Sequence, residues 1–377
     1  MSINDIIMYI MVIFMILGAV DRIIGNKFGL GTQFEEGFNA LGSLALAMVG
    51  VISLAPVLAA LLRPIVVPIY TALGADPAMF ATTILANDMG GAPLALELAN
   101  DPNAGQFAAF IIGAMMGPTI VFSIPVALGI IDTKDHKYLA LGVMAGIITI
   151  PIGAFFGGLT AGYNVGFIIK NLVPIVIFAI LLVLGLIFIR DILIKIFNVF
   201  SKILVILITI ALALAIVEQL LGVQIVKFNM GGQEVTMAPI TDGIATIGAI
   251  AIVLAGAFPF VYVFTKVAKK PLEAIGKMLG MNDIGAAGLV ATLANNIPMF
   301  QIMKDMNNKG KVINVAFAVS AAFTFGDHLG FTAGYAEGLY RNMIGPMIVA
   351  KLIGGITAIV VAIIISNIAL SPTEKEQ

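Results

Sequence analysis

Apolar residues along the chain gather into long runs that are separated by short polar stretches. A helix needs about 17 to 25 such residues to cross a bilayer, and most of the runs have this length. They fall at residues 4–22, 38–60, 79–98, 106–131, 139–161, 166–189, 196–220, 241–265, 284–303, 312–331 and 343–367. The connections are too short to hold a soluble domain, so the pattern predicts an all-α polytopic membrane protein.

The polar stretches between the runs add little structure of their own. The longest, Gly222–Pro239, alternates polar and apolar residues around a Gly-Gly pair, which predicts a small hairpin outside the membrane. The last residues, 371–377, are predicted to form a solvated polar tail. The leader "MSIND" carries no basic residue and no cleavage-like site follows, so the first run is interpreted as a retained span.

An internal repeat links the two halves of the chain. The stretch from Glu35 matches the stretch from Thr241 in order and at a nearly constant offset. The matched residues are Gly37 with Gly243, Gly42 with Gly248, Ala45 with Ala251 and Gly50 with Gly256, followed by "LAND" from Leu85 with "LANN" from Leu293. We therefore predict a first repeat at 1–165, a connecting span at 166–194 and a second repeat at 195–370.

The distribution of lysine and arginine bears on the direction of the repeats, because these residues collect in cytoplasmic loops. If every run crosses, the two sides hold about eleven and eight of them, which decides nothing. If 79–98 and 284–303 dip in and return, the sides hold fifteen and four. This asymmetry favours two re-entrant hairpins, nine crossings, an outer N-terminus, an inner C-terminus and inverted repeats. Full crossing by both broken runs remains the alternative.

The two runs predicted to be re-entrant carry polar tips. A half-helix of about ten residues reaches the middle of the bilayer, which places the turns at Asn87–Gly91 and Ala294–Pro298. An aspartate at that depth needs a partner or a task, so Asp88 is the leading candidate for a binding residue. Its carboxylate and the carbonyl end of the preceding half-helix would favour a cation. Neither broken run contains arginine or lysine, which argues against an anionic substrate. The further candidates at the tips are Asn87, Asn295 and Asn296.

A second polar cluster, "FGDHLGF" from Phe325, adds Asp327 and His328 as candidates. The repeat places this cluster opposite "GPTIVFSIP" from Gly117, with Gly326 over Gly117. Thr119 and Ser123 then become candidate hydroxyl contacts. His328 could shuttle protons, because imidazole titrates near physiological pH.

Composition narrows the classes of function. The chain is 60% hydrophobic and 11% charged, against about 25% charged in a soluble domain. Its net charge of −1 gives no sign of nucleic-acid binding. There is no cysteine, the two histidines lie far apart, and no phosphate-loop motif occurs, so no metal, cofactor or catalytic residue is predicted.

Several strings resemble one bacterial family. At "IIMYIM…AVDRI", "GPTIVFSIPVALGII", "TLANNIPMF", "GKVINVAFAVSAAF" and "GDHLGF", the sequence is similar to the ethanolamine-utilisation membrane protein family, EutH. The resemblance covers essentially the whole chain. It implies a multi-pass permease of the bacterial inner membrane that admits ethanolamine.

The resemblance and the residues agree on a small cation as substrate. Protonated ethanolamine could place its ammonium at Asp88 and its hydroxyl at one of the asparagines or at Thr119. The leading hypothesis is facilitated, potential-driven uptake of ethanolamine. The alternative is a proton- or sodium-coupled carrier, in which Asp88, Asp327 and His328 are the coupling groups. A remote alternative is an intramembrane enzyme acting on an amino-alcohol headgroup. The expected partners are ethanolamine and the lipid bilayer, and a homo-oligomer is left open.

Overall fold

The computed structural model describes residues 3–371 and residue 374, and most of them are helical. The helices of more than twelve residues are α1 (Ile3–Ile23), α2 (Leu30–Leu44), α3 (Gly50–Ala72), α9 (His136–Thr160), α10 (Val165–Phe188), α11 (Arg190–Leu221), α12 (Ile240–Met278), α15 (Asn308–Ala321) and α17 (Ile344–Ala369). The shorter helices are α4 (Ala78–Ile84), α5 (Ala92–Leu98), α6 (Pro102–Gln106), α7 (Met116–Pro118), α8 (Ile124–Ile130), α13 (Asp283–Ala294), α14 (Asn296–Ile302) and α16 (Asp327–Gly338).

Short π-helical and 3₁₀ turns join several of these helices. They are η1 (Ala45–Val49), η2 (Asn87–Gly91), η3 (Phe107–Ile112), η4 (Thr119–Ser123), η5 (Thr133–Asp135), η6 (Met303–Asp305) and η7 (Arg341–Met343). Within the described residues, seven helices are long and apolar enough to cross a membrane, and a bent pair, Pro102–Ile112 with Met116–Ile130, makes an eighth. This confirms the predicted all-α polytopic fold.

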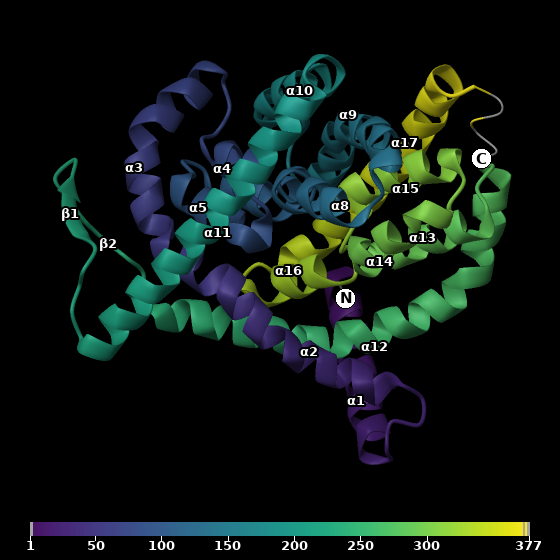
Figure 1. Cartoon of the computed structure of the whole chain (residues 1–377). Helices are drawn as coiled ribbons and strands as arrows, with labels where there is room; N and C mark the ends of the chain where they lie inside the picture. Colours follow the sequence, from purple (N-terminus) through teal and green to yellow (C-terminus); the bar gives the residue numbers. More distant parts are fainter. Residues whose placement is uncertain (1–2, 372–373, 375–377) are drawn as a thin grey trace.

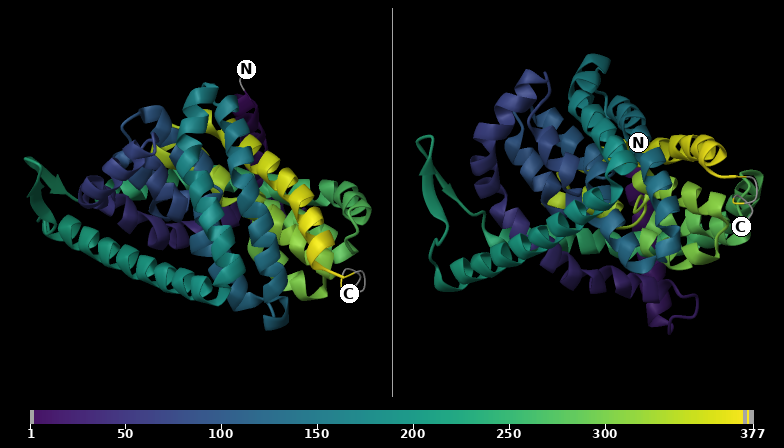
Figure 2. Two further views of the ribbon diagram at one scale, coloured as in Figure 1. Left: turned by 90° about the horizontal axis from the view of Figure 1, so that it is seen from above. Right: turned by 45° about the horizontal axis from the view of Figure 1, so that its top comes forward.

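The hairpin predicted at Gly222–Pro239 is also present. Strands β1 (Lys227–Met230) and β2 (Gln233–Thr236) pair antiparallel around Gly231 and Gly232. Both glycines have positive φ, at 61° and 82°, as a two-residue turn of this kind requires. The hairpin projects from the helical body at one end of the molecule (Figure 2). Of the predicted polar tail at 371–377, only Ser371 and Glu374 lie within the described residues.

The first broken run is a helical hairpin whose two ends lie side by side. α4 and α5 contact each other, and the chain enters and leaves the hairpin next to Asp76. The Asp76 carboxylate accepts the backbone N–H groups of Ala78 (2.9 Å), Asn100 (3.1 Å) and Asp101 (3.0 Å). The run therefore turns back instead of crossing, as the lysine and arginine count favours.

The second broken run has the same construction at its base. The Asn282 side chain donates to the carbonyl oxygen of Asp305 (2.9 Å), and the Asn307 side chain donates to that of Gly280 (2.8 Å). The residues before α13 and after α14 are thus held together. Figure 1 shows α4 and α5 on the side of the β-hairpin, and α13 and α14 on the side of the C-terminus.

Each hairpin tip meets a second broken helix that the hydropathy pattern presents as unbroken. The run 106–131 is interrupted at 113–115, and the run 312–331 is interrupted at 322–326. At the first crossing, Asn87 N–H donates to the carbonyl oxygen of Gly113 (2.9 Å). At the second, Phe323 N–H and Phe325 N–H donate to the carbonyl oxygens of Thr292 (3.1 Å) and Leu293 (3.0 Å). The two segments that meet at each crossing form hydrogen bonds with each other's backbone groups. Non-helical backbone inside a membrane protein is tolerated when its polar groups are paired in this way.

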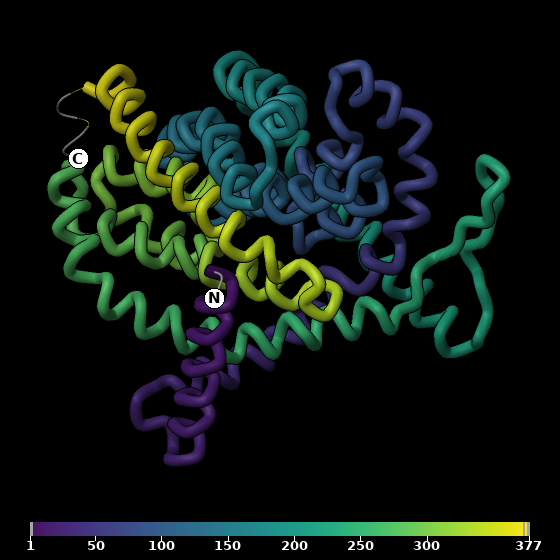
Figure 3. Tube along the Cα trace, turned by 180° about the vertical axis from the view of Figure 1, so that it is seen from behind, coloured from purple at the N-terminus to yellow at the C-terminus, as the bar shows by residue number. Residues whose placement is uncertain are grey.

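Several helices extend beyond the apolar runs that predicted them. α12 continues from the run 241–265 to Met278 and includes Lys266, Lys269, Lys270 and Lys277. Lysine and glutamate are good helix formers, so the helix does not end where the hydrophobic surface ends. α12 packs along α2 and crosses the lower part of the molecule beneath the shorter helices, as the views from the front and from behind show (Figures 1 and 3).

Candidate functional site

The first hairpin tip presents a carboxylate at its turn. The helix α4 ends at Ile84, and Leu85 and Ala86 are extended, with ψ of 138° and 148°. The chain then turns through η2, where Gly90 has φ of 92°. An additional carbon on Gly90 would collide with the side chain of Val51. The glycine therefore permits both the backbone conformation and the close packing that place Asp88 at the tip.

Asp88 faces a cavity of about 230 Å³ between the first hairpin tip, η1 and the start of α16, which we call the central cavity. The polar groups that line this central cavity are Asp88, Asp327 and His328, with Ser43 on the α2 side. Its apolar lining is Leu44, Ala47, Met48, Ala86, Met89, Pro118, Phe122 and Phe323. The hairpin tip, the start of α16 and the helix α2 therefore surround one small chamber.

The structure brings together three of the eight candidate residues, Asp88, Asp327 and His328. Asp88 is more than two hundred positions away from Asp327 and His328 in the chain, and only the fold makes them neighbours. Asp88 and Asp327 are half-buried, whereas His328 is buried. The carboxylates are the groups through which a small cation can be held.

A lysine that the sequence analysis passed over completes the site. Lys351, in the first third of α17, is only 1% exposed. Its ammonium nitrogen lies 2.5 Å from the carbonyl oxygen of Ala114 and 3.0 Å from Nδ1 of His328, and it interacts electrostatically with Asp88. A lone lysine inside the apolar run 343–367 is as costly as Asp88, so the same argument could have found it.

When Lys351 is protonated, it determines which nitrogen of His328 carries the proton. An ammonium group has hydrogen atoms to donate and no lone pair to accept with. Nδ1 of His328 must then be the acceptor, and a neutral ring places its proton on Nε2. With Lys351 charged, His328 is therefore a neutral imidazole in this arrangement. The ring of Phe323 stacks on it at a centroid distance of 5.1 Å.

Phe323 has an unusual backbone that serves the cavity wall. Its φ is 63°, a left-handed value that is an outlier for a bulky residue. The ring contacts Phe122 edge-on at 5.6 Å as well as His328. Such strained residues persist only where the surroundings determine them, and they concentrate at binding sites. The break at 322–326 thus directs an aromatic ring into the chamber.

The other candidates are engaged with the protein instead of lining this cavity. The Thr119 hydroxyl lies 2.8 Å from the carbonyl oxygen of Met115 and 3.2 Å from that of Val319. The Asn295 side chain accepts the N–H of Ile297, 2.8 Å away, and so caps α14. These two residues hold the broken helices in place.

Asn296 and Ser123 bond to each other. The Asn296 amide donates to the Ser123 hydroxyl at 2.8 Å, and Asn296 is completely buried. Asn87 is also completely buried, and its amide atoms make no hydrogen bond within the described part of the chain. It lies behind the tip, against Gly113, and does not line the cavity.

The lining of the central cavity is suited to an organic cation. The central cavity combines two carboxylates with aromatic and aliphatic walls. Carboxylates attract an ammonium group, and aromatic faces attract it as well.

Comparisons with known proteins agree with the resemblance found in the sequence. The family model "Ethanolamine utilisation protein, EutH" matches residues 3–365. The chain is 63% identical to a "Probable ethanolamine permease EutH" of Listeria monocytogenes, over 100% of this chain and 98% of that protein. It is 52% identical to a protein of the same name from Escherichia coli, over 97% and 96% of the two chains. An "Uncharacterized protein YxeR" of Bacillus subtilis is 49% identical, over 95% and 94%. No solved structure matches. The chain therefore belongs to the EutH family of ethanolamine utilisation proteins.

Proposed function

We propose that this chain is a permease that carries protonated ethanolamine across the bacterial inner membrane, with the central cavity as its binding site. Its relatives in Listeria and Escherichia carry the name of a probable ethanolamine permease. That name implies a transporter, which favours transport over catalysis on an amino-alcohol headgroup.

The observation that carries the proposal is the pair of carboxylates, Asp88 and Asp327, that line one cavity. With both carboxylates ionised and Lys351 protonated, the group holds two negative charges and one positive charge. His328 is neutral, so the group is short of one positive charge. An uncompensated charge is costly inside a membrane protein. One monovalent ammonium ion supplies the missing charge, whereas an anion or a neutral amino alcohol does not.

The walls of the cavity support the same choice of substrate. The ammonium group binds between the carboxylates of Asp88 and Asp327. The rings of Phe122 and Phe323 cover its hydrocarbon part and add a cation–π attraction. The substrate hydroxyl is left to bond the outer oxygens of the carboxylates or the exposed hydroxyl of Ser43.

Transport in this scheme moves one positive charge and no proton. His328 accepts a hydrogen bond from Lys351 and holds its own proton on Nε2, so it has no role as a proton carrier. The membrane potential then contributes about 2.3 kcal/mol per elementary charge per 100 mV. Uptake is driven by this potential and by the substrate gradient.

Two further features support inverted repeats at residues 1–165 and 195–370, joined by the span at 166–194. Equivalent helices α2 and α12 pack antiparallel, since Gly37 lies against Ala255 and Gly243 against Val49. The equivalent glycines Gly50 and Gly256 lie against the first helix of the opposite repeat, α11 and α1 respectively. In an inverted pair, hairpins from the two sides meet at the centre, which suits alternating access to one cavity.

Uptake of labelled ethanolamine into proteoliposomes tests the proposal. At an imposed inside-negative potential of about 100 mV, the ammonium form should accumulate roughly 50-fold. A proton or sodium gradient at a fixed ammonium concentration should add nothing. His328→Gln, whose side-chain oxygen can still accept from Lys351, should retain uptake within a few-fold. Accumulation driven by a sodium or proton gradient alone would instead establish the coupled mechanism, and no uptake at all would refute the permease.

A further inference from the structure

A second cavity, of about 480 Å³, lies toward the end of the molecule that carries the β-hairpin. It is formed by α3, α5, the start of α12 and the end of α16. We refer to it as the outer vestibule, because the lysine and arginine distribution places this face outside. The residues of its lining that carry the argument are Glu97, Asp242, Glu337, Tyr335, Tyr340 and Ile52.

The charged lining of the outer vestibule is entirely acidic. Glu97, Asp242 and Glu337 are exposed, and none of them forms an ion pair within the described part of the chain. The nearest basic side chains are already engaged. Arg63 donates to the carbonyl oxygen of Glu97 (2.5 Å), and Arg341 donates to that of Ala333 (3.3 Å).

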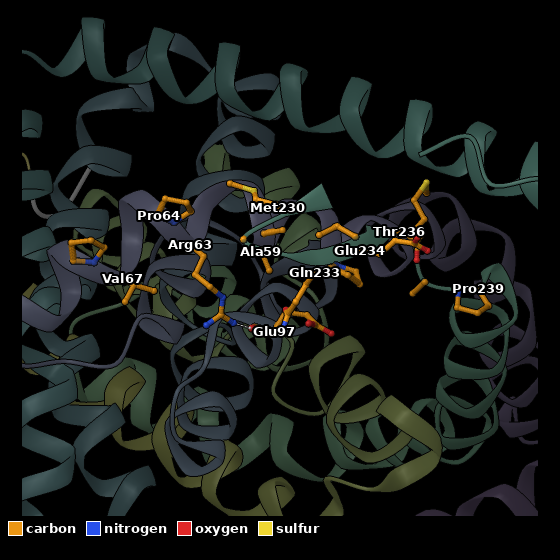
Figure 4. A pocket seen from close by; sticks show the side chains of 17 residues that line it. Ala59, Arg63, Pro64, Val67, Glu97, Met230, Gln233, Glu234, Thr236 and Pro239 are labelled. Carbon is orange, nitrogen blue, oxygen red and sulfur yellow. Dashed lines mark hydrogen bonds between the residues drawn. The ribbon is translucent and has the colours of Figure 1, made fainter. Parts of the chain in front are cut away.

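Figure 4 shows the adjoining cavity beneath the β-hairpin, in which Arg63 turns toward Glu97. This larger cavity, of about 890 Å³, shares Pro56, Glu97 and Ala238 with the outer vestibule. The two cavities therefore adjoin at Glu97. The larger cavity also holds Arg63, but the charged lining of the outer vestibule itself is of one sign, and such a lining between low-dielectric walls concentrates ions of the opposite sign.

A buried tyrosine points to a ligand independently of these acids. Tyr335 is only 8% exposed, yet it lines the outer vestibule. Its hydroxyl makes no hydrogen bond with the described residues, although it interacts electrostatically with Tyr340 and Glu97. A buried polar group normally has a partner. A hydroxyl directed into an acidic chamber is suited to receive an N–H donor, and the ring offers a face to a cation.

The outer vestibule lies directly above the central cavity. Met48 lines the central cavity and Ile52, one helical turn later, lines the outer vestibule. Along α16, Asp327 and Tyr335 are eight positions apart, which is about 12 Å of helix. Between them Phe331, 1% exposed, packs on the ring of Tyr335 at 5.0 Å. Phe331 therefore lies between the two chambers along α16, and we call its ring the Phe331 layer.

We propose that the outer vestibule is a second, recruiting site for primary ammonium ions, which it holds above the central cavity before they pass the Phe331 layer. This inference rests on the proposed transport of a cation. The three carboxylates and the rings of Tyr335 and Tyr340 supply the attraction. At low substrate concentration the site supplies ammonium ions to the central cavity. It is not needed for the movement of the ion across the membrane.

The first measurement is the concentration dependence of ethanolamine uptake at low and high salt. The triple variant Glu97→Gln, Asp242→Asn, Glu337→Gln should raise the concentration for half-maximal uptake roughly tenfold at low ionic strength and leave the maximal rate unchanged. At about 1 M salt, where the Debye length falls to about 3 Å, the variant and the native chain should coincide. A matched control, Glu36→Gln, Asp191→Asn, Asp283→Asn, makes the same charge change at exposed positions that the lysine and arginine distribution assigns to the inner side, and it should behave as the native chain.

The second measurement detects binding without transport. The chain has no tryptophan, so Tyr340→Trp introduces a single fluorescent reporter in the outer vestibule. Titration with ethanolamine hydrochloride should change its emission, and ethylene glycol should not. The change should persist when Asp88→Asn disables the central site, and it should disappear in the triple variant.

The outcomes separate the two proposals. A titration that vanishes with Asp88→Asn, or one that survives the loss of the three carboxylates, would overturn the recruiting site while leaving the permease intact. Binding at the reporter in a protein that takes up no ethanolamine would refute the permease and keep the site. A triple variant with unchanged half-maximal concentration at low salt would also overturn the inference.

Discussion

The two re-entrant hairpins share a construction and differ in chemistry. Each is held together at its base by the side chain of an aspartate or asparagine, and each tip crosses a broken helix. The first tip turns Asp88 into the central cavity. At the equivalent position of "LANN", the second tip carries Asn296, which bonds Ser123 and is completely buried.

The two hairpin tips are alike in backbone and unlike in charge. Asp88 reaches the central cavity, whereas Asn296 is enclosed by the crossing, where a carboxylate could not meet a cation bound in that cavity. The second tip uses a neutral amide to close the crossing, and the second carboxylate of the cavity comes from Asp327 at the start of α16.

The strongest test of the comparison is which side of the membrane each hairpin base faces. The expected difference in labelling between the two bases is nearly all or none. The chain has no cysteine, so single cysteines report without background. A membrane-impermeant maleimide added to intact cells should label Asn103→Cys, at the base of the first hairpin, and leave Lys304→Cys, at the base of the second, unlabelled. Glu234→Cys on the β-hairpin and Lys134→Cys serve as outer and inner controls. Labelling of both bases from one side would exclude inverted repeats.

The next effect concerns the charge at the tips. Asp88→Asn removes a charge-assisted contact to the ammonium, which is worth about 2 to 3 kcal/mol, so ethanolamine uptake should fall roughly 30- to 160-fold. The fold should survive, because the amide is of the same size. Exchanging the tips, Asp88→Asn with Asn296→Asp, should not restore uptake, since position 296 is enclosed by the crossing. Proteoliposome uptake measures both variants, and recovery in the exchanged protein would show that the tips are equivalent after all.

The smallest effect is one of stability at the two crossings. A side-chain carbon on Gly117 would collide with the carbonyl oxygen of Leu85, and one on Gly326 with that of Ala294. Gly117→Ala and Gly326→Ala should each lower the melting temperature of the purified protein, because backbone must move. The equivalent helical glycines Gly42 and Gly248 have open space within 4 Å, so Gly42→Ala and Gly248→Ala should leave it unchanged or raised. An unchanged melting temperature with alanine at position 117 or 326 would mean that the backbone at the crossings can move apart at little cost in stability.

Much of this architecture could be predicted from the sequence. The apolar runs, the breaks at "LAND" and "LANN", the Gly-Gly turn of the β-hairpin and the match of Gly117 with Gly326 are all local patterns. Each has a local cause: the thickness of the bilayer, the backbone freedom of glycine, or the close approach that glycine allows. The re-entrant course of the two broken runs followed from the distribution of lysine and arginine, and the contacts at both hairpin bases agree with it.

What the tertiary structure decided is which polar groups meet. The breaks at residues 113–115 and 322–326 depend on the neighbouring hairpin tip, whose backbone forms hydrogen bonds with the broken helix. The rotation of each helix, which only packing sets, turned Asp88, Asp327 and His328 into one cavity and engaged Thr119, Asn295 and Asn296 elsewhere. Lys351 joins this group only in the folded chain, where α17 brings it beside His328. The hydropathy of a segment predicts whether that segment is buried in the membrane. The set of charged groups that share a buried site depends on residues far apart in the sequence, which only the folded chain brings together.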